Sequence, residues 1–204
     1  MNKDKLLQTN IEPLLDYFKS IIPLNIEEKQ SVAELFKPRL YRKKQYILQE
    51  GDICTQFNFV VRGCLRSYKI DDKGNIHVLQ FAVENNWIND LGSFHGERPS
   101  SLNIDALEDT VVFQISLDNL KTLYIKTPKF DRIFRVLIEN GFIRLQERLL
   151  QNISSTAEER YEAFLELYPY LSNRLSQVLI ASYLGITPEF LSRLRSKALK
   201  SLKS

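Results

Sequence analysis

The chain has 204 residues, of which 44% are hydrophobic and 26% charged, and its formal net charge is +3 at pH 7. These proportions are those of an ordinary soluble globular protein, long enough for one large domain or two small ones. No apolar run approaches the roughly 20 residues of a membrane-spanning helix, and the first ten residues lack an apolar core followed by a cleavage site. We therefore expect a cytoplasmic protein without a membrane partner.

Two cysteines and two histidines limit the metal and redox chemistry of the chain. Cys54 and Cys64 are too few for an iron–sulfur cluster held by four thiolates, and a reducing compartment disfavours a disulfide. We expect both to be small buried residues of strands. His77 and His95 have no Cys or His at metal-ligand spacing, so no metal site is expected. Because these four residues form no recognisable acid, base or nucleophile set, we do not expect an enzyme.

Near Pro38 the pattern changes from helical to strand periodicity. Residues 10–36 predict two short helices separated at Pro23. From Pro38 to about Ile115, short segments rich in β-branched and aromatic residues alternate with turn signals. The clearest expected strands are residues 57–61, 64–70, 77–81 and 110–115. Several short strands at this spacing predict an antiparallel barrel or roll.

After Ser116 the helical period returns. Ser116 or Asp118 is expected to cap a short helix to Tyr124, and Thr127-Pro128 begins a long helix to about Ile153. Along it an apolar stripe recurs every three or four residues: Phe134, Ile138, Phe142, Leu145 and Leu149. One face can rest on the barrel, and the other needs a partner. We favour a parallel coiled-coil dimer over a single-chain helical bundle.

Residues 177–195 have the pattern of two helices joined by a tight turn. Gly185 can adopt the left-handed conformation that ends the first helix, Thr187 can cap the second, and Pro188 fits its first position. The pattern predicts a DNA-binding helix-turn-helix, because its second helix exposes groups that hydrogen-bond to bases and phosphates. The expected DNA-binding residues are Thr187, Glu189, Ser192, Arg193, Arg195, Ser196 and Lys197. The alternative is an αα-corner in an ordinary helical domain.

Basic residues gather in two stretches of the sequence. Between Glu189 and Ser204, Arg193, Arg195, Lys197, Lys200 and Lys203 stand against the single acid Glu189. This places positive charge where the helix-turn-helix would meet phosphates. The second stretch, Lys37, Arg39, Arg42, Lys43 and Lys44, lies at the first strand of the barrel. There we favour a solvated sheet edge over a second nucleic-acid site.

A barrel, a long helix and a terminal helix-turn-helix in this order resemble the CRP/FNR family of bacterial transcription regulators, the relatives of the cyclic-AMP receptor protein. The resemblance covers nearly the whole chain. Its most specific marks are Glu50-Gly51-Asp52, residues 60–63, residues 157–160 and the helix-turn-helix. The resemblance implies an α+β fold. It would contain an antiparallel β-roll (a double-stranded β-helix of the cyclic-nucleotide-binding type) with flanking helices, and a helix-turn-helix with little or no wing. The implied domains are a sensory roll at 1–126, a dimerisation helix at 127–153 and a DNA-binding domain at 154–204.

In this family two subunits pair through the long helices, and their recognition helices read the half-sites of a palindromic operator. By position, Glu189 and Arg193 fall where that helix contacts bases, and Pro188 replaces a basic residue of the best-known member. The implied partners are double-stranded DNA, a second copy of the chain, RNA polymerase and an unknown small-molecule effector. The rival hypothesis is an effector-binding or protein-interaction module whose helix-turn-helix does not read DNA.

The resemblance places an effector pocket at residues 87–101. The family uses a Gly-Glu pair for the ribose and an arginine followed by a hydroxyl residue for the cyclic phosphate. Here Asp90 stands for the acid, but Ser100 occupies the arginine position, so a buried phosphate would lose its bidentate partner. The expected pocket residues are Asp90, Leu91, Arg98, Ser100 and Ser101, and the positions facing adenine are Arg148 and Leu149. A cyclic nucleotide as cofactor is therefore disfavoured.

Overall fold

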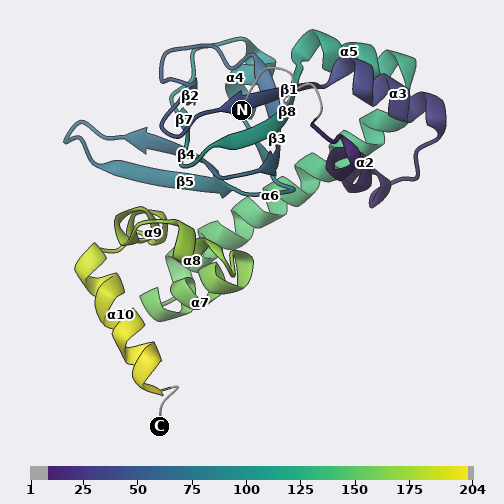
Figure 1. Ribbon diagram of the computed structural model, residues 1–204. Coiled ribbons are helices and arrows are strands. Elements are labelled where there is room, and N and C mark those ends of the chain that lie inside the picture. Colours follow the sequence, from purple (N-terminus) through teal and green to yellow (C-terminus); the bar gives the residue numbers. More distant parts are fainter. Residues whose placement is uncertain (1–8, 202–204) are drawn as a thin grey trace. The chain divides into compact units, whose positions relative to one another are not determined.

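The computed structural model describes the backbone of residues 9–201 and the side chains of residues 9–197. The chain forms two compact units (Figure 1). Unit 1 comprises Met1–Lys69 and Gln80–Glu139, and unit 2 comprises Ile70–Leu79 and Asn140–Ser204. We describe each unit by itself.

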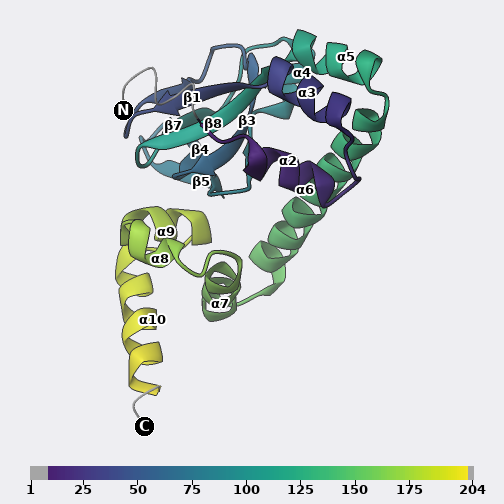
Figure 2. The ribbon, with the colours of Figure 1, turned by 45° about the vertical axis from the view of Figure 1, so that its right-hand side comes forward.

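The expected antiparallel roll is confirmed. Two four-stranded sheets have the strand orders β1-β8-β3-β6 and β2-β7-β4-β5 (Figures 1 and 2). The strands are β1 Lys37–Tyr41, β2 Tyr46–Leu48, β3 Gln56–Arg62, β4 Leu65–Ile70, β5 Ile76–Ala82, β6 Trp87–Ile88, β7 Asn103–Ala106 and β8 Thr110–Ser116. In the first sheet β1 is an edge strand, and its Lys37 and Arg39 side chains are exposed. The basic stretch thus begins on an exposed sheet edge, as expected.

Flanking helices cover the roll in unit 1. They are α2 Glu12–Lys19, α3 Ile26–Leu35, α4 Leu91–Gly96, α5 Leu117–Lys126 and the first part of α6 Lys129–Ser154. The two N-terminal helices separate around Pro23 as expected, and Ser116 rather than Asp118 caps α5, accepting a hydrogen bond from the Asn119 amide at 3.3 Å. Aromatic rings fill the core around Trp87, whose ring centroid lies 5.0 Å from that of Phe57 and 5.9 Å from that of Phe18.

Phe134 lies in the core of unit 1 and not on the dimer stripe expected from the sequence. Its side chain is only 3% exposed, and its ring centroid lies 5.8 Å from that of Trp87. Ile138, one turn later, is half-buried against the same core. Assigning Phe134 to a subunit interface was wrong because helical spacing shows which residues share a face but not what covers that face.

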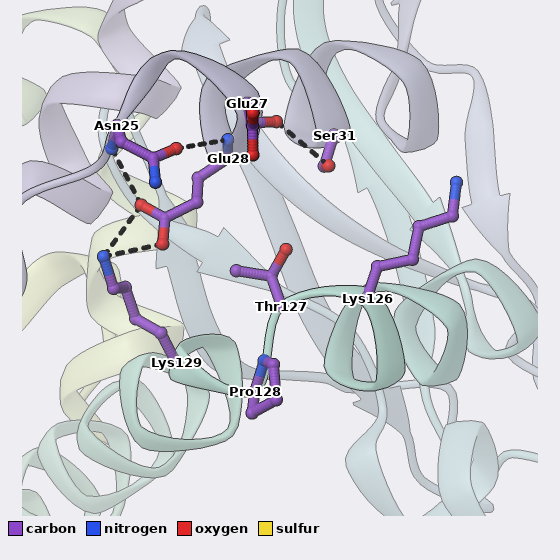
Figure 3. A pocket seen from close by; sticks show the side chains of 8 residues that line it. All are labelled: Asn25, Glu27, Glu28, Ser31, Lys126, Thr127, Pro128 and Lys129. Atoms are coloured by element: carbon purple, nitrogen blue, oxygen red, sulfur yellow. Dashed lines mark hydrogen bonds and ion pairs between the residues drawn. The ribbon is translucent and has the colours of Figure 1, made fainter.

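A charged corner fixes the start of α6 to the start of α3 (Figure 3). Lys129 Nζ contacts the Glu28 carboxylate at 2.7 Å and donates to the carbonyl oxygen of Pro23 at 2.9 Å. Asn25 and Glu28 cap α3 reciprocally, each side chain accepting from the other residue's amide. Partial burial raises the pKa of Glu28, but its bonds to Lys129 and Asn25 outweigh this and lower the pKa overall. These groups line a cleft of about 280 Å³ and satisfy one another, so the corner is a structural joint.

A partly buried ion pair joins β4 to β7. The Arg66 guanidinium donates two hydrogen bonds to the Asp105 carboxylate, both at 2.8 Å, and its Cζ lies 4.1 Å from the ring centroid of Tyr68. Both cysteines are buried, as expected. However, Cys54 and Cys64 lie in connections beside strands rather than within them, which corrects their predicted location.

Unit 2 contains the second part of α6 and four further helices among its described residues. They are α7 Ala157–Leu167, α8 Leu171–Arg174, α9 Gln177–Leu184 and α10 Pro188–Ser201. The expected break after α6 is confirmed, and Thr156 caps α7 in a capping box with Glu159. The described part of α10 is helical to Ser201. The expectation of little or no wing concerns residues after Ser201, which lie outside the described residues. None of the described helices is long and apolar enough to cross a membrane.

Candidate nucleic-acid interface

The turn between α9 and α10 has the geometry that its sequence predicts. Gly185 is left-handed at φ 68° and ψ 35°, and the amide of the following Ile186 donates to the carbonyl oxygen of Ala181 at 3.0 Å. Thr187 Oγ1 accepts a hydrogen bond from the Phe190 amide at 3.2 Å, which caps α10. Pro188 occupies the first helical position, where its missing N–H leaves no bond unmade. The turn is therefore fixed by local chemistry.

A buried seam holds the two helices together. Ala181 is fully buried, and its small side chain lets the helices approach closely. Leu191 on α10 is fully buried as well. The other members of the seam, all at most 7% exposed, are Ile180, Leu184 and Leu194. Because these residues fix the rotation of α10 about its axis, they also determine which of its side chains face outward.

The outward face of α10 brings together most of the expected DNA-binding residues. Glu189, Ser192, Arg193, Ser196 and Lys197 are exposed along it, while Arg195 is half-buried at its flank. Ser196 Oγ donates to the carbonyl oxygen of Ser192 at 3.0 Å, so that hydroxyl is engaged by its own helix. Polar, acidic and basic groups thus lie on one side of α10, and no described side chain covers that side.

Phe190 is a residue of this surface that the sequence pattern did not single out. Its ring is half-buried at the first turn of α10, and Arg193 Cζ lies 5.4 Å from the ring centroid. Residues three apart on a helix are neighbours, so the spacing of Phe190 and Arg193 was a readable signal. It was missed because a phenylalanine at helical spacing is usually assigned to the core.

Arg160 on α7 closes the carboxyl end of α9. Its Nε donates to the carbonyl oxygen of Leu184 at 3.2 Å, and its Nη1 donates to that of Ser155 at 2.7 Å. A cation at a helix C-terminus interacts favourably with the helix dipole. Beside it, the rings of Phe164 and Tyr183 pack at 5.6 Å between centroids. The α7 helix therefore positions the first helix of the helix-turn-helix.

Arg148 forms a second junction within unit 2. Its Nη2 donates to the carbonyl oxygens of Val78 and Tyr183, each at 3.0 Å, and its Cζ lies 3.9 Å from the Tyr183 ring centroid. Ser182 Oγ accepts from the Val78 amide at 3.1 Å and donates to the carbonyl oxygen of Ile76. Burial lowers the pKa of Arg148 from its usual value, although arginine stays protonated at neutral pH. The guanidinium is thus engaged in joining α6, α9 and the segment 70–79.

The part of α6 that lies in unit 2 exposes a run of large apolar side chains. Phe142 is 65% exposed and Leu149 is 58% exposed. The others are Ile143, Leu145, Leu150 and Ile153, each at least 48% exposed. Ile138, Phe142, Leu145 and Leu149 follow the alternating spacing of four and three residues that marks a coiled-coil seam. An exposed apolar stripe of this kind is typical of a protein interface.

At the expected effector site, the polar groups of the loop bind one another. Ser100 Oγ donates to Asp90 Oδ2 at 2.7 Å, and the Ser93 amide donates to Asp90 Oδ1 at 3.1 Å. Ser93 Oγ in turn accepts from the Cys54 amide at 2.8 Å and donates to the carbonyl oxygen of Arg98 at 2.6 Å. Asp90 and Ser100 are therefore brought together by this network, which joins the loop to α4.

The other expected pocket residues lie outside this network. Leu91 is 39% exposed, and Arg98 and Ser101 are also exposed. The Arg98 side chain folds back over α4, so that a Cβ built on Gly92 would lie 3.1 Å from Arg98 Nη2. At the position that the resemblance gives to the phosphate-binding arginine, Ser100 offers a hydroxyl that is bound to Asp90, so no guanidinium is held there for a cyclic phosphate.

Comparisons with known proteins agree with this architecture. The cyclic nucleotide-binding domain model matches residues 38–127. The chain is 28% identical over 180 residues to the anaerobic regulatory protein of Aggregatibacter actinomycetemcomitans, covering 83% of this chain and 68% of that protein. It is 28% identical over 199 residues to the fumarate and nitrate reduction regulatory protein of Vibrio cholerae, covering 88% of this chain and 77% of that protein.

A solved structure supports the same fold. FixK2 from Bradyrhizobium japonicum superposes with a TM-score of 0.73 at 22% identity, over 82% of this chain and 86% of that chain. The domain model, the two regulatory relatives and this shared fold all point to one group of proteins, the group that the order of elements in the sequence already resembles. The chain thus matches a cyclic nucleotide-binding domain over residues 38–127 and is similar over most of its length to transcription regulators of the CRP/FNR family.

Proposed function

We propose that the chain is a homodimeric transcription regulator that binds a specific DNA sequence through α10. The observation that carries this proposal is the outward face of α10, where Glu189, Ser192 and Arg193 are exposed on a helix held by a buried seam and a capped turn. An arginine can donate two bonds to guanine O6 and N7, and a glutamate can accept from cytosine N4. The relatives' names describe regulators, which supports the same function.

The proposed organisation follows the boundaries expected from the sequence. Residues 1–126 form the sensory domain, 127–153 the dimerisation helix and 154–204 the DNA-binding domain. Support for dimerisation comes from the exposed stripe that includes Phe142, Leu145 and Leu149. Two chains paired about a two-fold axis would present two copies of α10 to half-sites about 34–36 Å apart, which is one turn of the duplex. The operator is therefore a palindrome, read once by each subunit.

The sensory roll is proposed to respond to a molecule other than cyclic AMP. The Asp90 carboxylate and the Ser100 hydroxyl, at the positions that the resemblance gives to the ribose-binding acid and the phosphate-binding arginine, bind each other. A phosphate bound at Ser100 would lack a guanidinium partner and would break the hydrogen bond to Asp90. Because these polar groups bind one another, the alternative within this proposal is that the roll has lost the ability to sense a small molecule.

Replacing Arg193 by alanine tests the proposed reading of DNA. We expect discrimination between a selected duplex and a single-base variant at its guanine to fall by about 1–3 kcal/mol, because one bidentate contact is lost. Fluorescence anisotropy on both duplexes measures this difference. The matched control is Lys197→Ala, which should weaken binding to both duplexes alike because a phosphate contact carries no sequence information. Equal losses on both duplexes for Arg193→Ala would contradict the assignment.

Calorimetric titration with cyclic AMP tests the proposed selectivity of the roll. We expect no saturable heat at micromolar ligand, because residue 100 offers a hydroxyl instead of a guanidinium and that hydroxyl already binds Asp90. The Arg98→Ala variant is titrated in parallel, since Arg98 is the nearest candidate for a substitute cation. Micromolar binding that Arg98→Ala abolishes would show that the family's ligand is bound through a displaced arginine.

A further inference from the structure

We propose that Phe190 and Arg193 act as one reading unit, in which the phenylalanine ring orients the guanidinium toward a guanine and its free edge contacts the methyl group of an adjacent thymine. This inference rests on the proposed function and names a specificity residue within it. The geometry on which it depends is the position of Arg193 Cζ, 5.4 Å from the centroid of the Phe190 ring.

The first part of the inference concerns the guanidinium. A cation within about 6 Å of a ring centroid is attracted to the ring face. Among the described residues the structure shows no hydrogen bond or ion pair for the Arg193 side chain, so its N–H donors remain free for a base edge. A free arginine samples many rotamers, and contact with a neighbouring ring reduces the entropy lost when it binds. Phe190 is thus a positioning residue for Arg193.

The second part concerns the ring itself. Its backbone is fixed because the Phe190 amide donates to Thr187 Oγ1 at 3.2 Å. Phe190 is half-buried, and its ring lies beside Arg193, whose Cζ is 5.4 Å from the ring centroid. Three residues along a helix correspond to a rise of about 4.5 Å, close to the roughly 3.4 Å between base pairs. Phe190 would therefore face the base pair next to the one that Arg193 reads.

An apolar ring in the major groove favours one base feature. The C5-methyl of thymine is the apolar group that the major-groove edges of the base pairs present, and phenylalanine is among the side chains that contact it. Burying one methyl group against the ring should strengthen binding about fourfold. The combined unit predicts an operator half-site in which a thymine directly neighbours the guanine read by Arg193.

Base analogues test the unit atom by atom on a duplex selected by the full-length protein. Replacing the neighbouring thymine by uracil removes only the methyl group, and we expect wild-type affinity to fall about fourfold. The Phe190→Ala variant should be insensitive to that change. Phe190→Leu keeps apolar bulk but loses the ring face, so it should stay sensitive to uracil. In Phe190→Leu, substitution of guanine by 7-deazaguanine should cost about two- to fivefold less affinity than in wild type.

Tyr170→Ala is the matched control, because Tyr170 is another aromatic residue of unit 2 and is 78% exposed. This variant should respond to both base analogues as wild type does. If Phe190→Ala binds as tightly as wild type, or more tightly, the ring does not assist Arg193 and the inference is wrong. The inference also fails if uracil has no effect beside the guanine. A duplex library that yields no enriched sequence would instead refute the proposed function itself.

Discussion

Replacing both Phe142 and Leu149 by glutamate is expected to convert the protein from a dimer of about twice 23.9 kDa into a monomer. The two side chains are 65% and 58% exposed on the apolar stripe of α6. In a parallel pair of helices each substitution would place two like charges opposite each other across the seam. Sedimentation equilibrium measures the mass of the variant, and circular dichroism checks that it remains helical.

The same variant should lose DNA affinity. A dimer binds its second half-site as an intramolecular event, which strengthens binding by about 100- to 10,000-fold over a single half-site. We therefore expect the double variant to bind a palindromic duplex at least about 100-fold more weakly. Arg144→Glu is the matched control, because Arg144 is exposed on the opposite side of α6, about 200° around the helix from Phe142. A double variant that stays dimeric would place the subunit interface elsewhere.

Gly63→Ala is expected to destabilise unit 1 by about 3 kcal/mol or more, since overpacking and backbone strain each contribute about 1–3 kcal/mol. Gly63 has φ +106°, which side-chain-bearing residues rarely adopt. A Cβ at this position would lie 2.5 Å from Thr110 Oγ1 and 2.7 Å from Thr110 Cα. Thr110 begins β8, which is held between β1 and β3, so its backbone cannot easily move away.

Gly51→Ala separates the two causes of that destabilisation. Gly51 also has a positive φ, +94°, but a Cβ there would meet nothing within 4 Å. This control should lose only the backbone term, about 1 kcal/mol. Thermal unfolding should then show Gly63→Ala about 6–12 °C below wild type, at about 2–4 °C per kcal/mol for a chain of this size. If the two variants unfold at the same temperature, the contact with Thr110 has no energetic importance.

Local chemistry explains the parts of the fold that the sequence predicts well. The turn of the helix-turn-helix depends on Gly185, Thr187 and Pro188, each of which acts through its own backbone or through a bond to a residue close in sequence. The starts of α3 and α7 also follow from local chemistry, because a capping residue immediately precedes each helix. Such signals can be read from one sequence because both partners of each interaction lie in the same short segment.

Short elements and contacts between residues far apart in the chain could not be predicted from the sequence. The β6 strand has two residues and α8 has four, which is too few for a periodic pattern. The Arg66–Asp105 pair joins positions 39 residues apart, and Arg148 finds its acceptors 35 and 70 residues away. Phe134 shows the same limit, since its spacing along α6 fits a dimer stripe although its side chain packs in the core. Contacts of this kind depend on the fold, which the residues at either end do not specify alone.

The candidate site was predictable in its composition but not in its geometry. The polar and basic face of α10 follows from residue types and helical spacing, and the exposed positions of Glu189 and Arg193 agree with it. The role inferred for Phe190 needed the distance to Arg193. Likewise, the missing arginine at Ser100 was visible in the sequence, whereas its hydrogen bond to Asp90 was not.

Selection from a random library of DNA duplexes with the wild-type protein tests the central claim most directly. We predict an enriched palindromic sequence whose two half-sites lie about 10–10.5 base pairs apart between centres, because two copies of α10 would read successive turns of one face of the duplex. Enrichment should disappear when Arg193→Ala replaces the wild type in the same selection. A pool that stays random, or an enriched sequence without two-fold symmetry, would contradict a dimeric reader of DNA.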